Sequence, residues 1–339
     1  MKKNSILILG SILCFICLFA CNSNQQTEEA YANMPPELAN IYKKINKDPS
    51  NAALYVELSD YYTKTSTLDS ALNTILTALR LDSNNANYYL KLSDIYFAMQ
   101  NIDASEEILE KVIAIDRTNK EAYLKLAELH FLHKRYKEAR KCLDDVLLID
   151  NYNPKAYFIR AWVYKEEGDT NAAIRSYMAA VEQDPNYFEA YEDLGVLYHH
   201  KKDPLAISYY KNALNIKPDN IQVLYNLAMF YQETGDFEKA LQQYKMILQL
   251  NPTYTYALHN IGWIYMIEQQ KYDEAIAFFT KAIESDTSYI EAIYNRGVAF
   301  ESLKKYNNAR QDYAYVLKLN DTYELAIQGL NRLDKLQNK

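Results

Sequence analysis

The feature that most constrains the fold is a repeat of about 34 residues that runs through most of the chain. A period of this length indicates supersecondary units that stack on one another, because one such unit cannot bury its apolar face alone. Small residues mark the period with separations of 34, 34, 34, 33, 34, 35 and 34 residues; they are Ala71, Ser105, Ala139, Ala173, Ala206, Ala240, Ala275 and Ala309. Eight repeats are therefore predicted over residues 52–323, with the ranges 52–85, 86–119, 120–153, 154–187, 188–220, 221–254, 255–289 and 290–323.

Each repeat is predicted to contain two helices, since apolar residues recur at i, i+3, i+4 and i+7 on both sides of a central corner. The corner of repeat 4, EEGDTNAAIRSY, returns in repeat 6 as ETGDFEKALQQY. A Gly-Asp pair could belong to a phosphate loop, a metal loop or a turn, but no Lys-Ser pair follows it here. We expect Gly235 to end one helix in the left-handed conformation and Asp236 to cap the next.

Composition supports a helical protein and narrows its function. Only 7 Gly and 8 Pro interrupt 339 residues, fewer than the turns of a sandwich or barrel require. The formal net charge is −7 and no basic cluster opposes it, which argues against nucleic-acid binding. The chain also lacks a P-loop, a dinucleotide-binding fingerprint and an HExxH pair, so no cofactor is predicted.

The pattern resembles the tetratricopeptide repeat family over about four fifths of the chain. This resemblance implies an all-α solenoid, a right-handed superhelix of helix-turn-helix units with a concave groove that binds peptides. Repeat 5 lacks one residue near Asp203 and repeat 7 has one more near Glu268, both in inter-helix turns. The signature positions of repeat 6 are Leu224, Leu227, Ala228, Tyr231, Ala240, Tyr244 and Pro252, with Ile247 in place of the usual alanine.

Both ends of the array are predicted to carry capping helices. Residues 36–51 resemble only the second helix of a repeat, and residues 324–339 supply a closing helix. Terminal units with one polar face are what a stacked array needs at its ends.

The first 20 residues read as an export signal, with Lys2 and Lys3 before the apolar run Ile6–Ala20. This run is short for a membrane span, which needs about 20 residues. Cys21 follows Ala20 in a pattern that resembles the lipobox of bacterial lipoproteins. The resemblance implies that Cys21 is lipidated and becomes the mature N-terminus; the alternative is an uncleaved apolar anchor. Residues 21–35 would then form a flexible tether.

The resemblance also implies a location in the cell envelope. Asn22 after the cysteine favours the outer membrane over the inner one by analogy with lipoprotein relatives, and we expect the array to face the periplasm. Without residues 1–20 the chain keeps a single thiol besides Cys21, at Cys142, so no intramolecular disulfide is expected.

Candidate partner-binding residues lie on one stripe of the first helices, opposite the core stripe. In the family that stripe lines the groove, and large aromatic residues outside the core indicate a contact surface. Tyrosines at these places are also common in generic repeats, so packing within the superhelix is the alternative. Repeat 3 places Glu121, Leu124 and Glu128 here, which disfavours an acidic peptide tail. The candidates are Phe158, Trp162, Tyr225, Met229, Tyr256, His259, Trp263 and Tyr294.

Few residues point to catalysis or metal binding. His130 and His133 are three residues apart on a helix, but His130 replaces a core tyrosine and no third ligand is evident. His199 and His200 are expected to be solvated, and Cys142 to be buried and inert. No catalytic or metal-binding residues are predicted.

These observations favour a non-catalytic scaffold that binds other envelope proteins or peptides and meets the membrane through its N-terminal lipid. Family analogues include adaptors for cell-wall hydrolases and members of outer-membrane assembly or secretion complexes. The alternative, from another class, is an enzyme or a small-ligand receptor with its site in the groove.

Overall fold

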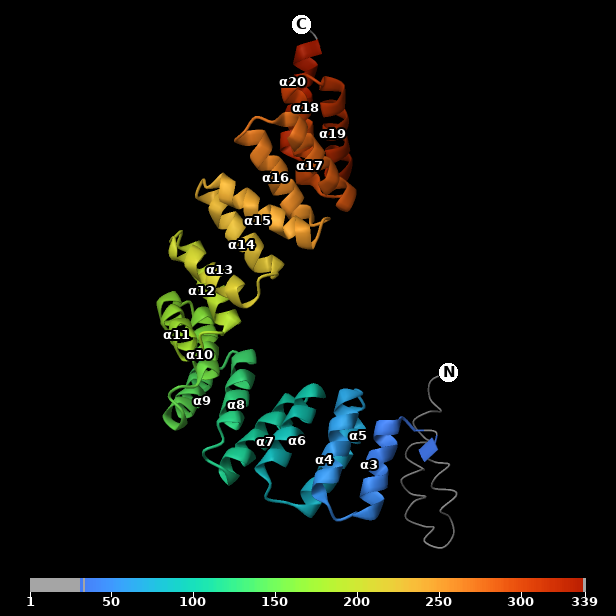
Figure 1. Ribbon diagram of the computed structural model, residues 1–339, viewed down its shortest axis with the longest axis vertical. Coiled ribbons are helices and arrows are strands. Elements are labelled where there is room, and N and C mark those ends of the chain that lie inside the picture. The colour runs from blue at the N-terminus through green and yellow to red at the C-terminus, as the bar shows by residue number, and fades with distance from the viewer. Residues whose placement is uncertain (1–30, 33, 338–339) are drawn as a thin grey trace. The chain divides into compact units, whose positions relative to one another are not determined.

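The computed structural model describes residues 31–32 and 34–337, and this part of the chain folds into helices joined by short turns (Figure 1). The predicted signal, Cys21 and most of the tether lie outside the described residues. The helices are α3 (Pro36–Lys47), α4 (Ala52–Lys64), α5 (Leu68–Leu81), α6 (Ala86–Ala98), α7 (Ile102–Ile115), α8 (Lys120–Leu132), α9 (Tyr136–Ile149), α10 (Pro154–Glu166), α11 (Thr170–Gln183), α12 (Phe188–His200), α13 (Leu205–Ile216), α14 (Ile221–Glu233), α15 (Phe237–Leu250), α16 (Thr255–Ile267), α17 (Tyr272–Ser285), α18 (Ile290–Ser302), α19 (Tyr306–Leu319) and α20 (Glu324–Gln337).

The described helices form two compact parts, divided after Asn151, which we call the N-terminal part and the C-terminal part. Inside each part, every helix packs against the helix before it and the helix after it. The even-numbered helices α4 to α18 are the first helices of the repeats, and the odd-numbered helices α5 to α19 are the second helices. This arrangement confirms the predicted all-helical solenoid of stacked hairpins.

The corner between the two helices contains a residue with positive φ in all eight repeats. Gly168 and Gly235 both adopt φ of +82°, and Asp169 and Asp236 accept hydrogen bonds from the amides of Ala172 and Lys239. The predicted capped corner is thus confirmed. Other side chains take the left-handed conformation in the remaining repeats, at Ser66, Gln100, Lys134, Lys202, Gln270 and Lys304. A left-handed corner is therefore a demand of the hairpin, and glycine meets it in two cases only.

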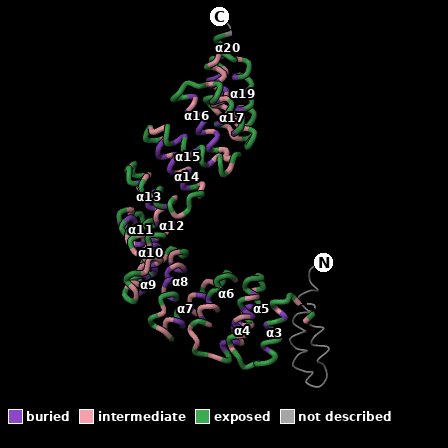
Figure 2. The backbone as a smooth tube through the Cα atoms, viewed as in Figure 1, coloured by how far each residue is buried: buried purple, intermediate pink, exposed green. Residues whose placement is uncertain are grey.

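The core runs between the stacked hairpins, and buried positions alternate with exposed ones along every helix (Figure 2). The alanines of the repeat series are fully buried, because the two helices approach each other closely there. The residue four places after this small residue fills the centre of each hairpin and is at most 1% exposed. From repeat 1 to repeat 8 it is Ile75, Leu109, Leu143, Tyr177, Tyr210, Tyr244, Phe279 and Tyr313.

The helices at the two ends cover the apolar sides of the adjacent repeats. In α3, Ala39, Ile41 and Ile45 are buried against the N-terminal part. In α20, Ala326 and Leu333 are buried against the last repeat. Both helices therefore close the hydrophobic core of the part to which they belong.

Candidate functional site: the first-helix stripe

The candidate surface is a row of side chains on the first helices. It comprises positions 2, 5, 6, 9 and 12, counted from the first residue of each repeat, and we call it the first-helix stripe. The first helices α12 and α14 contact each other directly, and so do α16 and α18. Stripe residues of these neighbouring repeats therefore lie next to one another.

In the N-terminal part positions 6 and 9 of the stripe form charged pairs, while position 12 is Phe97, which is 46% exposed, in repeat 2 and Phe131 in repeat 3. Lys91 Nζ lies 2.6 Å from Asp60 Oδ1, and Lys125 Nζ lies 2.7 Å from Asp94 Oδ1. Each pair joins position 9 of one repeat to position 6 of the next. Lys125 also lies 3.5 Å from Glu121, so the acidic stripe predicted for repeat 3 is partly neutralised. Exposed pairs of this kind contribute about 0–1 kcal/mol each.

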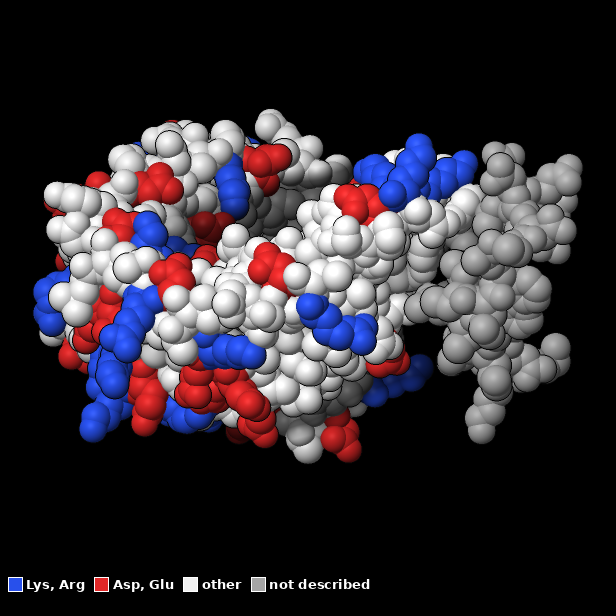
Figure 3. Space-filling model, turned by 90° about the horizontal axis from the view of Figure 1, so that it is seen from below, with Lys and Arg blue, Asp and Glu red and all other residues white. Residues whose placement is uncertain are grey.

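Charge on the outside of the molecule is similarly mixed. Where charged side chains lie on the described surface in view, lysine and arginine are interspersed with aspartate and glutamate (Figure 3). Interspersed charges of both signs do not produce the one-sided field that attracts nucleic acid.

The C-terminal part replaces the charged stripe with aromatic and amide groups, beginning at repeat 4. Phe158 is 6% exposed, with its ring centroid 4.7 Å from Trp162 and 4.9 Å from Tyr187. It supports the surface from beneath and is not itself open to contact. Trp162 is half-buried, and its Nε1 donates a hydrogen bond to Asp193 Oδ2 over 3.4 Å. Its indole is thus held in place by the next repeat.

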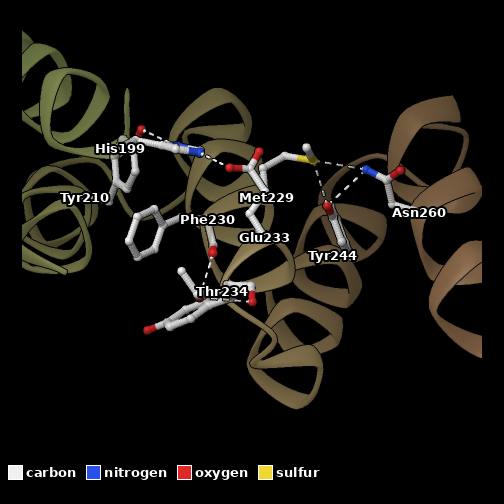
Figure 4. A network of polar contacts seen from close by, with 9 residues as sticks. His199, Tyr210, Met229, Phe230, Glu233, Thr234, Tyr244 and Asn260 are labelled. Atoms are coloured by element: carbon white, nitrogen blue, oxygen red, sulfur yellow. Dashed lines mark hydrogen bonds and ion pairs between the residues drawn. The ribbon is translucent and has the colours of Figure 1, made fainter. Parts of the chain in front are cut away.

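Repeats 6 and 7 are joined by a polar network beneath the stripe (Figure 4). Asn260 Nδ2 donates to the Tyr244 hydroxyl over 2.9 Å and contacts Met229 Sδ at 3.4 Å. The Tyr244 hydroxyl in turn donates to Gln232 Oε1 over 3.0 Å. Burial raises the pKa of Tyr244, so this hydroxyl stays protonated and remains a donor. The network fixes Met229 and the neighbouring Tyr225, whose hydroxyl accepts from Asn260 over 3.3 Å.

His259 extends this network into repeat 8. Its Nδ1 lies 3.1 Å from Asn260 Oδ1, and its Nε2 lies 3.0 Å from Asn295 Nδ2. Because an amide nitrogen only donates, this geometry assigns the proton to Nδ1 and leaves Nε2 as the acceptor. Burial lowers the pKa of His259, which favours this neutral form.

The other three candidates differ in exposure. Tyr256 is 52% exposed, the largest value among the eight. Trp263 is half-buried, with its ring 6.4 Å from Phe237, and Tyr294 packs beside Tyr313 at 5.7 Å. The structure thus brings Tyr225, Met229, Tyr256 and His259 together in repeats 6 and 7. It places Phe158 with Trp162 in repeat 4, and Trp263 and Tyr294 at separate points along the stripe.

Sequence reasoning missed a set of tyrosines at the ends of repeats. Each pairs with the aromatic ring at position 5 of its own repeat, at 4.9 to 6.0 Å between centroids; the pairs are Phe158–Tyr187, Tyr225–Tyr254, His259–Tyr289 and Tyr294–Tyr323. The other four repeats have a non-aromatic residue at position 5 and end in asparagine, at Asn85, Asn119, Asn153 and Asn220. The asparagine side chains cap the next helix, whereas Tyr187, Tyr254 and Tyr289 make no such hydrogen bond.

This exchange explains why aromatic residues cluster on the stripe of the C-terminal part. Losing an asparagine cap costs about 1 kcal/mol, and an aromatic pair contributes about 0.5–1.5 kcal/mol beyond its buried area. The two choices are close in energy, so a repeat can use either. The signal was present in the sequence as the co-occurrence of tyrosine at the repeat end with an aromatic residue at position 5.

The expectation that His199 and His200 are both solvated is wrong for His199. Its Nε2 lies 3.1 Å from Glu233 Oε2 and its Nδ1 lies 3.3 Å from the Tyr210 hydroxyl (Figure 4). The buried hydroxyl of Tyr210 needs a polar partner, and position 12 of the first helix supplies it. Gln232 does the same for Tyr244. Only His200 is exposed.

The expected burial of His130 and Cys142 is confirmed, at 7% exposure for each. Burial raises the pKa of Cys142 to about 12, so the thiolate that a nucleophile requires is scarcely populated. His130 Nδ1 lies 3.9 Å from Glu106, which forms a two-point ion pair with Arg135. These groups stabilise the hairpin interface of repeats 2 and 3.

Two further findings concern the described residues alone. No group of three or more His, Cys, Asp or Glu side chains is arranged there to hold a metal ion. None of the helices between residues 31 and 337 is both long enough and apolar enough to cross a bilayer.

Comparison with known proteins identifies the repeats. Tetratricopeptide repeat models match residues 96–161, 219–288 and 290–323, and a TPR repeat model matches residues 161–202. The chain is 31% identical over 146 residues to the photosystem I assembly protein Ycf3 of Rippkaea orientalis, which covers 39% of this chain and 71% of that protein. It is 34% identical over 104 residues to the same protein of Synechococcus elongatus, over 26% of this chain and 60% of that protein.

A solved structure shows the same fold. The C-terminal part of a TPR repeat-containing protein from Cytophaga hutchinsonii aligns with a TM-score of 0.63 and 20% identity, over 71% of this chain and 99% of that chain. Together with the capped corners, the small-residue series and the repeat models, this similarity leads to one conclusion. The chain belongs to the tetratricopeptide repeat family.

Proposed function

We propose that this protein is a non-catalytic scaffold, held in the bacterial cell envelope by lipid on Cys21, which binds partner proteins or peptides through the first-helix stripe of its C-terminal part. Proteins of the tetratricopeptide repeat family bind partner proteins or peptides.

One observation carries the choice of surface. In the C-terminal part the stripe presents Trp162, Tyr256 and Trp263, with amide and carboxylate groups beside them, whereas in the N-terminal part it carries ion pairs. Aromatic side chains with one polar edge, set among fixed neighbours, are the residues that contribute most to protein recognition. Rigid placement by the Asn260 network lowers the entropy that binding costs.

The anchor and the location rest on the sequence before residue 31. Lys2, Lys3, the apolar run and Cys21 support an exported lipoprotein. Stable attachment needs more than one acyl chain, which lipoproteins carry. The names of the matched Ycf3 relatives assign them to the assembly of photosystem I, and by analogy a role in assembling an envelope complex is the form of scaffold that we favour.

Crosslinking in intact cells tests the proposed surface. We expect Trp263→Ala and Trp162→Ala to reduce capture of the crosslinked partners by about tenfold each, as for a central aromatic contact. Tyr315→Ala is the matched control, because Tyr315 is 40% exposed on the second helix α19 and lies outside the stripe. Helical content, followed by circular dichroism, should be nearly unchanged in all three variants. Undiminished capture by both tryptophan variants would show that the stripe is the wrong surface.

The anchor is tested separately by fractionation. Cys21→Ala removes the acyl acceptor, so we expect the protein to leave the membrane fraction. Continued tight membrane association of Cys21→Ala would favour the uncleaved apolar anchor instead.

A further inference from the structure

Four tyrosines of the C-terminal part form a single cluster at the stripe, in which Tyr256 is exposed and the other three are half-buried. They are Tyr225 on α14, Tyr254 at the start of α16, Tyr256 on α16 and Tyr289 at the start of α18. Ring centroids lie 6.0 Å apart for Tyr225 and Tyr254, 6.2 Å for Tyr225 and Tyr256, and 5.9 Å for Tyr254 and Tyr256. Tyr289 adds a fourth ring 5.7 Å from Tyr256. We call this set the tyrosine cluster.

The geometry of the cluster suits a cation. Three of the centroids mark a nearly equilateral triangle, so a point a few ångströms above its centre lies within about 6 Å of every ring centroid. Cation–π attraction acts within that distance and is additive over the rings. Tyr256 is 52% exposed, so an incoming side chain can reach the cluster from solvent.

Elsewhere the protein covers aromatic rings with its own cations. Lys217 Nζ lies 3.9 Å from the Phe188 centroid and Lys111 Nζ lies 4.2 Å from that of Tyr89. The same arrangement recurs at Lys43–Tyr31, Arg160–Tyr157, Lys239–Tyr231, Lys271–Tyr265 and Lys281–Phe278. Within residues 34–337 no lysine or arginine lies over a ring of the tyrosine cluster.

Negative charge accompanies the cluster. Glu291 is exposed at position 2 of repeat 8, the position that Tyr256 occupies in repeat 7. After burial, the Glu291 carboxylate is the largest cause of the raised pKa of Tyr289, which places its charge beside the cluster. Glu291 takes part in none of the ion pairs among the described residues. The same surface thus offers aromatic faces and a carboxylate without a cationic partner.

We propose that the tyrosine cluster and Glu291 bind a positively charged side chain, lysine or arginine, presented by the partner protein. This inference rests on the proposed function, because it names what the stripe recognises. Charge complementarity sets the occupant: π faces and an unneutralised carboxylate attract a cation, and they repel an acidic side chain. A neutral aliphatic side chain would gain only from burial and would not depend on charge.

Small probes test this inference on the purified full-length protein. Chemical shifts of ¹³C-labelled tyrosine rings are followed during titration with N-acetyl-lysine amide, N-acetyl-norleucine amide and N-acetyl-glutamate amide. The norleucine probe has a similar apolar stem and lacks the ammonium group. We expect the lysine probe to bind about two- to fivefold more tightly than the norleucine probe, with less difference at high salt. Equal or tighter binding of the norleucine probe would overturn the proposal.

Variants locate the effect. Tyr256→Leu should weaken binding of the lysine probe about two- to fivefold, whereas Tyr256→Phe keeps the ring and should stay within about twofold of the unmodified protein. Glu291→Gln should weaken it by about twofold, as for an exposed ion pair. Tyr315→Leu, outside the cluster, should have no effect. An unchanged affinity in Tyr256→Leu would overturn the proposal.

The inference and the proposed function can fail separately. If Trp263→Ala loses its cellular partners while the lysine probe shows no preference over norleucine, the cation site is wrong and the scaffold surface stands. If the lysine probe binds the cluster but both tryptophan variants and Tyr256→Leu capture partners as the unmodified protein does, recognition lies on another surface. That result would overturn the partner role proposed here for the cation.

Discussion

The N-terminal and C-terminal parts are built from the same helical hairpin, but different types of side chain fill its core. Repeats 1 to 3 place an aliphatic side chain at the centre of the hairpin, as Leu143 does in repeat 3, and repeats 4 to 8 place an aromatic ring there. The facing residue at position 8 changes in parallel. It is Ser59, Ser93 and Ala127 in the N-terminal part, and Ala161, Gly195, Ala228, Gly262 and Gly297 in the C-terminal part.

Space and hydrogen bonding explain this parallel change. A Cβ atom at Gly195 would lie 2.4 Å from the ring of Tyr210, so this ring leaves no room for a side chain at that position, whereas Ala161 and Ala228 are accommodated in repeats 4 and 6. The hydroxyls of Tyr210 and Tyr244 find polar partners at position 12, as does that of Tyr313 in Glu301 at 2.6 Å, whereas the buried hydroxyl of Tyr177 makes no hydrogen bond. Where the central residue is Phe279, position 12 is the apolar Met266. One substitution in the core thus constrains residues on the stripe.

The stripes of the two parts also differ in how their side chains find partners. In the N-terminal stripe, charged side chains pair with each other between neighbouring repeats, as Asp60 and Lys91 do. Asparagine caps stand there in place of the tyrosines at the repeat ends. The C-terminal stripe leaves aromatic surface at Tyr256 that the protein does not cover. The two parts therefore differ in the chemistry that they present on the stripe, and the proposed recognition surface lies on the C-terminal part.

The largest effect should come from the ion pair between Arg296 on α18 and the buried Asp312 on α19. Arg296 donates to both oxygens of Asp312 over 2.9 and 2.8 Å, and Asp312 is only 6% exposed. Asp312→Ala leaves the guanidinium half-buried without its carboxylate and should destabilise α18 and α19 by on the order of 3 kcal/mol. Asp60→Ala, in an exposed pair of the N-terminal part, should cost about 0–1 kcal/mol.

Hydrogen exchange of the two helix pairs measures these costs segment by segment, which is necessary because a repeat array can unfold in stages. Comparable protection losses in the two variants would remove the distinction between a buried and an exposed ion pair.

A smaller effect on stability is expected from giving repeat 5 the central and facing residues of repeat 3. Gly195→Ala improves helix propensity by about 1 kcal/mol but forces the Tyr210 ring to move, so a net loss of about 1–2 kcal/mol should result. Adding Tyr210→Leu recreates the Ala127 and Leu143 combination of repeat 3 and should recover most of that loss. Urea unfolding by circular dichroism measures both variants. Failure of the second substitution to compensate would mean that the ring is not the cause.

The smallest effect should appear in the dependence of stability on pH, for which each part contains one imidazole whose pKa is lowered by burial. Burial lowers the pKa of both His130 and His259 below the ordinary value of 6.5. The unfolded chain therefore binds protons below pH 6.5 that the folded chain does not bind. Stability is complete above that pH and falls as the pH is lowered through 6.5 towards the folded-state values.

Tryptophan fluorescence separates the two histidines, because Trp162 and Trp263, the only tryptophans of the chain, both lie in the C-terminal part. Between about pH 7 and pH 5, the urea midpoint measured by fluorescence should fall less in His259→Tyr than in the unmodified protein. In His130→Tyr the fall of this midpoint should be unchanged. The exposed His200→Tyr is the control. A fluorescence midpoint that falls equally in His259→Tyr would assign the pH dependence to other groups.

Local patterns in the sequence were sufficient to predict the fold. The apolar spacing of repeat 6, the Gly235-Asp236 corner and the small residue Ala240 each depend on neighbours within one hairpin, so a single repeat shows them and eight copies make them unmistakable. The burial of His130 and Cys142 followed from their places in the same pattern.

The candidate site was harder to predict from the sequence, because the burial and partners of its residues depend on contacts between repeats. Stripe position alone did not distinguish buried Phe158 from exposed Tyr256. It gave no indication that His199 would lie between Tyr210 and Glu233, which belong to different repeats. The tyrosine cluster likewise joins residues of repeats 6 and 7, and its members are 2 to 64 positions apart in the chain.

The sequence by itself therefore determined the helices, their corners and the order in which they stack, since periodic burial and capping act over one or two helical turns. Tertiary structure alone decided which aromatic side chains support the stripe and which remain open to a partner. That outcome depends on which rings of adjacent repeats meet, on the space a facing glycine leaves, and on where a buried hydroxyl finds its hydrogen bond.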